Sequence, residues 1–160
     1  MSQENNIVFA TLDKTKWLEL IVNSYQKYHA AGNNVSVYIS FSDSISVKGL
    51  TPMHLVTLAC LIQFLSDQGW KAFLSHNNQA VDDYIYNDLR FSEYWLGQKN
   101  HVDANQSTHV FNLWRIKDQE KDLYAKNVEA YFKNTYFKNK DLSAINLSLT
   151  EAFYNVFDHA

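Results

Sequence analysis

Three polar residues near the carboxyl terminus are spaced so that their side chains fall on one face of a helix. Glu151, Asn155 and His159 recur every four residues, while Phe153, Val156 and Phe157 supply apolar contacts elsewhere around the helix. An Asn amide oxygen is a hard, uncharged ligand of the kind that Mg²⁺ accepts in proteins. The pattern therefore predicts an active-site helix within residues 151–160.

The motif in this segment resembles the N-box of the GHKL ATPase superfamily, which includes gyrase-type ATPases, histidine kinases and anti-sigma-factor kinases. The matching pattern is Glu-x-x-x-Asn-x-x-x-His-Ala. The resemblance implies that Asn155 positions a magnesium ion against a triphosphate and that Glu151 is the catalytic base. His159 then occupies the His position of the anti-sigma-like branch, as a further candidate Mg-ATP residue.

The glycine content departs from this family's pattern. GHKL proteins need an Asp-x-Gly-x-Gly loop and a second Gly-rich lid downstream, and the four glycines here, at positions 32, 49, 69 and 97, form no phosphate cradle. We therefore expect the chain to be truncated after the N-box, with no cofactor of its own and no metal site. Mg-ATP is expected only if the GHKL domain is complete in a longer parent chain.

Composition limits the class of protein. With 160 residues, 46% of them hydrophobic, the chain has room for one domain, or one domain and the beginning of another. A net charge of -3 and scattered basic residues argue against nucleic-acid binding. The sequence has no apolar run of about 20 residues, so no membrane partner is expected. The single cysteine, Cys60, is expected to be a buried thiol, which fits a cytoplasmic protein.

Residue periodicity predicts an α/β fold. The expected strands cover residues 7–12, 35–41, 70–75 and 108–116. The expected helices cover residues 14–31, 52–68, 78–89 and 118–137, with a short helix or turn over 91–96, a solvated loop over 97–107 and a terminal helix near the end. Thr51 and Pro52 mark the start of the most apolar helix, and Gly69 marks its end.

The order of these elements resembles the STAS-like domains of bacterial regulators over roughly residues 7–116. The similarity rests on residues 35–41, on Gly49-Leu50 leading into the apolar helix, and on residues 88–91. It implies a mixed sheet of about four strands backed by helices, followed here by two C-terminal helices. STAS-like modules are found fused ahead of GHKL modules. We expect a STAS-like domain over residues 1–116, a connector helix over 117–140 and the N-box-like helix over 141–160.

The loop that enters the apolar helix is the regulatory surface in STAS-like proteins, and it typically presents a phosphorylatable Ser or Thr. Ser44 and Ser46 are the candidate phosphosites, ahead of Ser42 and Thr51. A phosphate there would add about two negative charges beside a helix N-terminus. Ser and Thr are also ordinary turn and cap residues, which is the competing interpretation.

Other reactive residues give weaker patterns. The six histidines lack metal-site spacing, and the adjacent carboxylates Asp82 and Asp83 point in different directions on a helix, so both are expected to be solvated. Ser75 and His76 could belong to a Ser-His-Asp arrangement, but the sequence has no Gly-x-Ser-x-Gly elbow to position a nucleophile, so hydrolase chemistry is not indicated.

The sequence thus favours a regulatory or signalling protein-interaction module that is not catalytic as given. Its expected partner is another protein or a second copy of the chain. One alternative is a small assembly-forming or effector protein that uses its aromatic C-terminal helices as an interface, because the chain has ten Tyr and ten Phe. Another is an ATP-binding kinase or ATPase in a longer parent chain.

Overall fold

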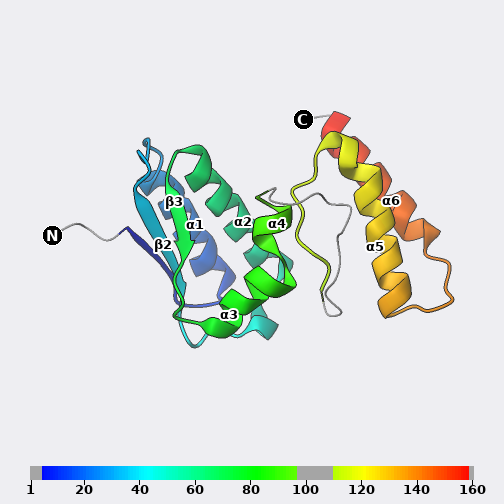
Figure 1. Cartoon of the computed structure of the whole chain (residues 1–160), viewed down its shortest axis with the longest axis horizontal. Coiled ribbons are helices and arrows are strands. Elements are labelled where there is room, and N and C mark those ends of the chain that lie inside the picture. Colours follow the sequence, from blue (N-terminus) through cyan, green and yellow to red (C-terminus); the bar gives the residue numbers. More distant parts are fainter. Residues whose placement is uncertain (1–4, 97–109, 159–160) are drawn as a thin grey trace. The chain divides into compact units, whose positions relative to one another are not determined.

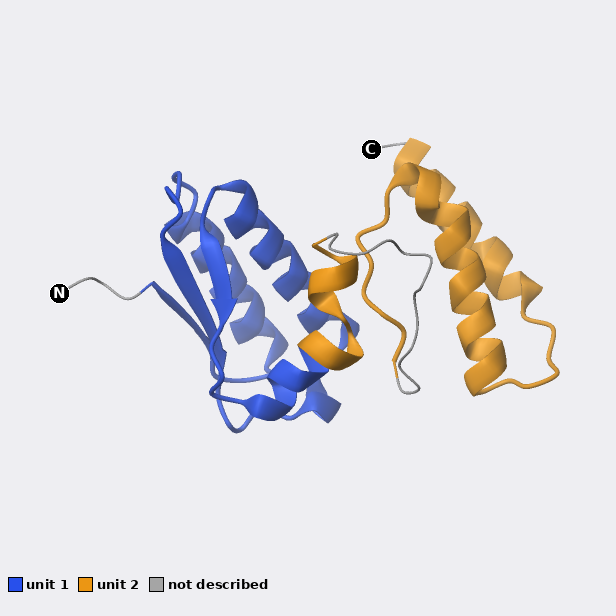
Figure 2. Cartoon of the chain, viewed as in Figure 1, with its two compact units in different colours: residues 1–85 blue, residues 86–160 orange. Residues whose placement is uncertain are grey.

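A computed structural model describes residues 5–96 and 110–158 of the chain (Figure 1). The chain divides into two compact units, residues 1–85 and 86–160 (Figure 2). The first unit is an α/β structure, and the second consists of helices and irregular segments. The α/β class is therefore confirmed. The predicted domain boundaries at residues 116 and 140 stay predictions.

Three parallel strands form the sheet of the first unit. They are β1 (Asn6–Phe9), β2 (Ser36–Phe41) and β3 (Lys71–Leu74), in the spatial order β1-β2-β3. The register places Ile7 beside Ile39, and Ile39 beside Leu74. Because the strands are parallel, the loops that follow all three emerge at the same edge of the sheet.

Two helices cover one face of this sheet. They are α1 (Lys14–Lys27) and α2 (Pro52–Asp67). Trp17 of α1 packs 4.0 Å from the Phe9 ring of β1, measured between centroids, and its indole N–H donates a 2.9 Å hydrogen bond to Thr57 of α2. Tyr25 and Phe64 add an edge-to-face contact between the two helices. The first core therefore lies between the sheet and this helix pair.

The opposite face of the sheet exposes apolar side chains. Val8, Tyr38 and Phe73 are each about half exposed, and the Tyr38 and Phe73 rings stack with centroids 5.9 Å apart. Side chains alternate between the faces of a strand, so these three residues share the face away from the core residues Ile7 and Ile39.

The prediction of a mixed sheet with about four strands was wrong in its detail. All the strands in the described residues are parallel, and residues 110–116 of the predicted fourth strand have no strand structure. In that segment Phe111 and Trp114 instead pack with their rings 5.8 Å apart and contact Tyr124, so their apolar character reflects an aromatic cluster. Residues 108 and 109, and the predicted loop over 97–107, lie outside the described residues.

Helix α1 ends at Lys27, four residues before the predicted end at residue 31. The cause is a side chain from a distant part of the chain. The Trp70 indole N–H donates to the carbonyl oxygens of Tyr28 and Ala30, at 3.2 and 3.0 Å, and its ring contacts the buried Tyr28 edge to face. The carbonyl groups beyond the helix therefore find their partner in Trp70 rather than in a further helical turn.

Helix α2 matches its predicted limits closely. Pro52 is its first residue, and Thr51 donates its backbone N–H to Nδ1 of His54 at 3.0 Å. The other ring nitrogen of the buried His54, Nε2, donates to the carbonyl oxygen of Leu12 at 3.1 Å. Gly69 follows the helix with a positive φ of 78°, as expected of a glycine that ends a helix.

The predicted helix over residues 78–89 is divided into two short elements. Helix α3 (Gln79–Asp83) passes directly into a π-helical turn over Tyr84–Asp88. A short 3₁₀ turn, Val47–Gly49, precedes α2. The prediction that Cys60 is buried was also wrong, because this residue lies on an exposed side of α2.

The second unit contains three α-helices in its described part. They are α4 (Phe91–Tyr94), α5 (Lys121–Thr135), which a 3₁₀ turn over Asp118–Glu120 precedes, and α6 (Ser143–Asp158). Helices α5 and α6 form a hairpin. No helix among residues 5–96 and 110–158 combines the length and the apolar character needed to cross a bilayer.

Candidate functional site

The loops after β2 and β3 bring polar side chains together at the carboxyl edge of the sheet. The β2 loop carries Ser42 and Ser44, and the β3 loop carries Ser75, His76 and Asn78. In open α/β sheets, the edge at the carboxyl ends of parallel strands is where ligands usually bind. We therefore treat this edge as one candidate site and α6 as the other.

Asn78 joins the two loops. Its amide nitrogen donates to the carbonyl oxygens of Ser42 and Ile45, both at 2.9 Å, and its amide oxygen accepts the backbone N–H of Val81 at 3.2 Å. The third bond caps α3, because Asn78 directly precedes that helix. One buried side chain therefore fixes the candidate phosphosite loop against the β3 loop.

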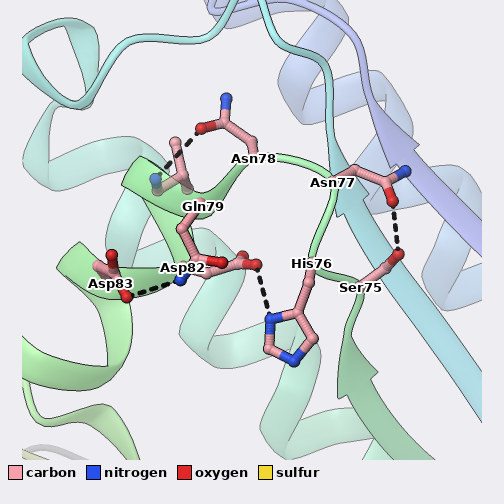
Figure 3. A network of polar contacts seen from close by, with 8 residues as sticks. Ser75, His76, Asn77, Asn78, Gln79, Asp82 and Asp83 are labelled. Carbon is pink, nitrogen blue, oxygen red and sulfur yellow. Dashed lines mark hydrogen bonds and ion pairs between the residues drawn. The ribbon is translucent and has the colours of Figure 1, made fainter.

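His76 and Asp82 form a pair beside this junction (Figure 3). Nδ1 of His76 lies 3.3 Å from Oδ2 of Asp82, and the His76 side chain is 75% exposed while that of Asp82 is 1% exposed. Neither carboxylate oxygen of Asp82 has a hydrogen-bond partner of good geometry. Burial raises the pKa of Asp82, and the nearby His76 ring partly opposes this shift.

This pair corrects one expectation from the sequence. Asp83 is exposed as predicted, but Asp82 is buried, because successive helical positions point in different directions. Asn78 and Asp82 are four residues apart, and this spacing places the cap residue and the buried carboxyl group on the same side of α3. The Ser75 hydroxyl donates to Asn77 at 3.1 Å, so these contacts do not assemble the Ser-His-Asp arrangement.

The candidate phosphosites Ser44 and Ser46 are both exposed. The Ser44 hydroxyl lies 3.0 Å from that of Ser42 and donates to the Ala10 carbonyl oxygen, after β1, at 3.5 Å. Ser46 precedes the 3₁₀ turn, and its side chain makes no capping bond there. Both hydroxyls are therefore accessible to a modifying enzyme, with Ser44 the more restrained of the two.

The residues of the N-box-like motif lie on the outer side of α6. Residues Ile145, Leu149, Phe153 and Phe157 are half-buried along one side, and five exposed residues occupy the opposite side, which we call the outer face of α6: Ala144, Leu147, Ser148, Glu151 and Asn155. Val156 is also exposed, contrary to its predicted packing role. His159 lies outside the described residues, so the structure brings together Glu151 and Asn155 only.

The inner side of α6 holds the hairpin together. Phe153 contacts Tyr124 of α5 edge to face at 5.5 Å, and Asn146 donates to a Glu129 carboxylate oxygen at 2.8 Å. Lys121 of α5 lies 3.6 Å above the Tyr154 ring. Burial raises the pKa of the Tyr124 hydroxyl, which is consistent with its position inside this interface.

A groove of ≈ 300 Å³ runs between α5 and α6 beside the outer face. Charged and amide side chains line it together with Leu147, which is 61% exposed. The lining residues are Asp122, Lys126, Glu129, Ser143, Asn146, Leu147 and Thr150. The hairpin therefore presents an apolar side chain next to groups of both charges, a combination common at protein interfaces.

In residues 5–96 and 110–158, no three His, Cys, Asp or Glu side chains gather into a possible metal site. At the carboxyl edge of the sheet, His76 and Asp82 offer an imidazole and a carboxyl group, which are groups suited to proton or group transfer. Glu151 and Asn155 offer a carboxylate and an amide in solvent.

No protein-family model matches this sequence, and no curated protein or solved structure matches it either. The geometry of the two candidate sites therefore carries the functional argument.

Proposed function

We propose that this protein is a regulatory protein-interaction module of the STAS-like and GHKL-related kind, and that it binds another protein through the outer face of α6. The observation that carries the proposal is the one-sided packing of α6, which has no fully buried residue and leaves Leu147 in solvent. Covering an exposed apolar side chain such as Leu147 contributes binding free energy, and the polar residues around it can add hydrogen bonds.

The first unit supports a regulatory role. The strand over Ser36–Phe41, the loop with Ser44 and Ser46, and the apolar helix α2 follow one another in the order expected of a STAS-like domain. Both serines are exposed, and Asn78 links their loop to the β3 loop. A phosphate at Ser44 would therefore act on a loop whose position is tied to its neighbour.

Nucleotide binding gives the first test of this proposal. Isothermal titration of the whole chain with ATP and Mg²⁺ should give no saturable heat, because Asn155 and Glu151 lie in solvent without a phosphate cradle in the described residues. Asn155→Ala is the matched control for any heat that does appear. Saturable binding that this substitution abolishes would favour the alternative function, an ATP-binding kinase or ATPase in a longer parent chain.

The docking face itself can be tested by capture and crosslinking. A photoreactive residue at position 147 should crosslink one specific protein from an extract of the source cells, and Leu147→Glu should abolish capture of that protein. Val56→Glu, which alters an exposed apolar residue of α2, is the control and should leave capture unchanged. Equal capture by both variants would contradict a role for the outer face.

Self-assembly through the C-terminal helices is the second candidate function. Tyr136 and Phe137, which follow the last residue of α5, are about half exposed, and Val156 is exposed near the end of α6. Sedimentation velocity over a concentration series distinguishes the two candidates. A monomer supports binding of a different protein, whereas a stable dimer that Tyr136→Ser dissociates supports assembly.

A further inference from the structure

His76 differs from an ordinary surface histidine because a buried carboxylate holds one of its ring nitrogens. An Asp82 carboxylate oxygen lies within ion-pair distance of Nδ1 of His76, at 3.3 Å, and the Asp82 side chain is 1% exposed. The other charged group of α3 close to this pair is the exposed Asp83, whose negative charge contributes to the raised pKa of Asp82. The carboxylate therefore fixes which side of the ring faces the protein.

This contact determines the reactive atom of the ring. A neutral imidazole that points Nδ1 at a carboxylate keeps its proton on Nδ1, which leaves the lone pair on Nε2. The His76 side chain is 75% exposed, so Nε2 is accessible from solvent. A carboxylate behind the ring also stabilises the positive charge that develops when Nε2 forms a new bond. These features together make Nε2 a nucleophile.

We propose that His76 is a phosphoryl-acceptor residue, with Nε2 as the reacting atom and Asp82 as the positioning residue. This proposal goes beyond the docking function above and does not depend on it. Phosphoryl is the transferable group that fits a nucleophile open to solvent, because a phosphoryl group on an imidazole nitrogen persists at neutral pH, whereas an acyl group is soon lost to water. The donor is a second molecule that carries a P–N or acyl-phosphate bond.

The transfer balances with the small donor phosphoramidate. The Nε2 lone pair forms the N–P bond while the P–N bond of the donor breaks, and the leaving nitrogen, already protonated in the donor, takes the bonding pair and departs as ammonia. The ring keeps its Nδ1 proton and becomes positively charged. That charge then lies beside the Asp82 carboxylate, which stabilises both the transition state and the product.

His29 provides an internal control. It is also exposed, and its Nδ1 lies 2.6 Å from the carbonyl oxygen of Gln26. The two histidines therefore share an accessible ring and a fixed Nδ1, and they differ in whether the partner is a carbonyl or a carboxylate. A faster reaction at His76 than at His29 isolates the contribution of Asp82.

The experiment treats the full chain with phosphoramidate and follows phosphorylation at each histidine by peptide mass spectrometry. His76 should react faster than His29, and His76→Ala should remove only the label at that position. Asp82→Asn should slow labelling of His76, because the positive charge that develops on the ring loses its carboxylate partner, and should leave His29 unchanged. Equal rates at both histidines, or no effect of Asp82→Asn, would overturn the proposal.

A second measurement on the unaltered protein covers the case in which Asp82→Asn does not fold. Long-range ¹H–¹⁵N NMR reports which ring nitrogen carries the proton. The expected result for neutral His76 is a proton on Nδ1, in contrast to the buried His54, whose proton lies on Nε2. A proton on Nε2 of neutral His76 would leave no nucleophilic lone pair there and would overturn the assignment.

Discussion

The two units of the chain use their helices differently. In the first unit, α1 and α2 bury apolar side chains against a sheet, and buried polar groups such as Asn78 and His54 join segments that lie far apart in the sequence. In the second unit, α6 packs along one side and has no fully buried residue. The first unit is thus stabilised by long-range contacts. The hairpin leaves the outer face of α6 exposed, and the proposed docking function rests on this difference.

The largest expected effect is on the core of the first unit. Trp17→Ala removes a fully buried ring that packs on Phe9 and bonds to Thr57, so it should lower the free energy of unfolding by about 3–5 kcal/mol. Hydrogen exchange of the β2 amides measures this loss. Trp17→Phe keeps most of the packing and should cost clearly less. Equal losses for both variants would mean that the hydrogen bond to Thr57 dominates.

Asn78, which joins the β2 and β3 loops, should give the next largest effect on stability. Asn78→Ala removes the cap of α3 and leaves the carbonyl oxygens of Ser42 and Ile45 without this donor, so about 2–3 kcal/mol of stability should be lost. Urea unfolding followed by circular dichroism measures the change. Asn77→Ala, at the exposed neighbouring position, should alter stability by no more than about 0.5 kcal/mol. A similar loss of stability in both variants would show that any substitution in this loop is destabilising, and that the hydrogen bonds of Asn78 are not the cause.

Truncating a packed side chain should cost less stability in the α5–α6 hairpin than in the α/β core. Phe153→Ala removes a half-buried ring that contacts Tyr124, and we expect about 1–2 kcal/mol less protection of the α6 amides against hydrogen exchange. Val156→Ala is the control, because this exposed side chain should contribute within about 0.5 kcal/mol. A loss at Phe153 as large as that at Trp17 would remove the contrast between the two units.

The smallest expected effect is a pH dependence that arises from Asp82. Burial raises the pKa of Asp82 in the folded state, so between the ordinary Asp pKa and this raised value the folded chain binds more protons than the unfolded chain. Stability from this group is therefore lost as the pH rises through that window. Asp82→Asn removes the titrating group, so its stability relative to the unaltered protein should increase with pH across the same window.

Urea midpoints from acidic to neutral pH measure this difference, which should stay below about 1 kcal/mol because the nearby His76 ring opposes part of the pKa shift that burial of Asp82 causes. Asp43→Asn, which removes an exposed carboxylate of the β2 loop, provides the control and should show no such trend. If the stability difference for Asp82→Asn decreased as the pH rose, the His76 contact rather than burial would govern the carboxyl group.

Local patterns in the sequence predicted several elements well. The alternation over residues 35–41 became β2, Thr51 and Pro52 marked the start of α2, and Gly69 marked its end. The four-residue spacing of Glu151 and Asn155 correctly indicated a shared helical face. These features depend on bonds and side-chain directions within a few residues, which the sequence contains directly.

Tertiary structure decided what depends on distant segments. Trp70 binds the carbonyl groups that follow the end of α1, and residues of a predicted strand pack instead in the aromatic cluster around Trp114. Asp82 is buried and Cys60 is exposed, the reverse of what the sequence predicted for each. Periodicity alone fixes which residues share a side of a helix, but the neighbouring elements determine whether that side meets a core or solvent. For that reason the pairing of His76 with Asp82 became visible only in the folded chain.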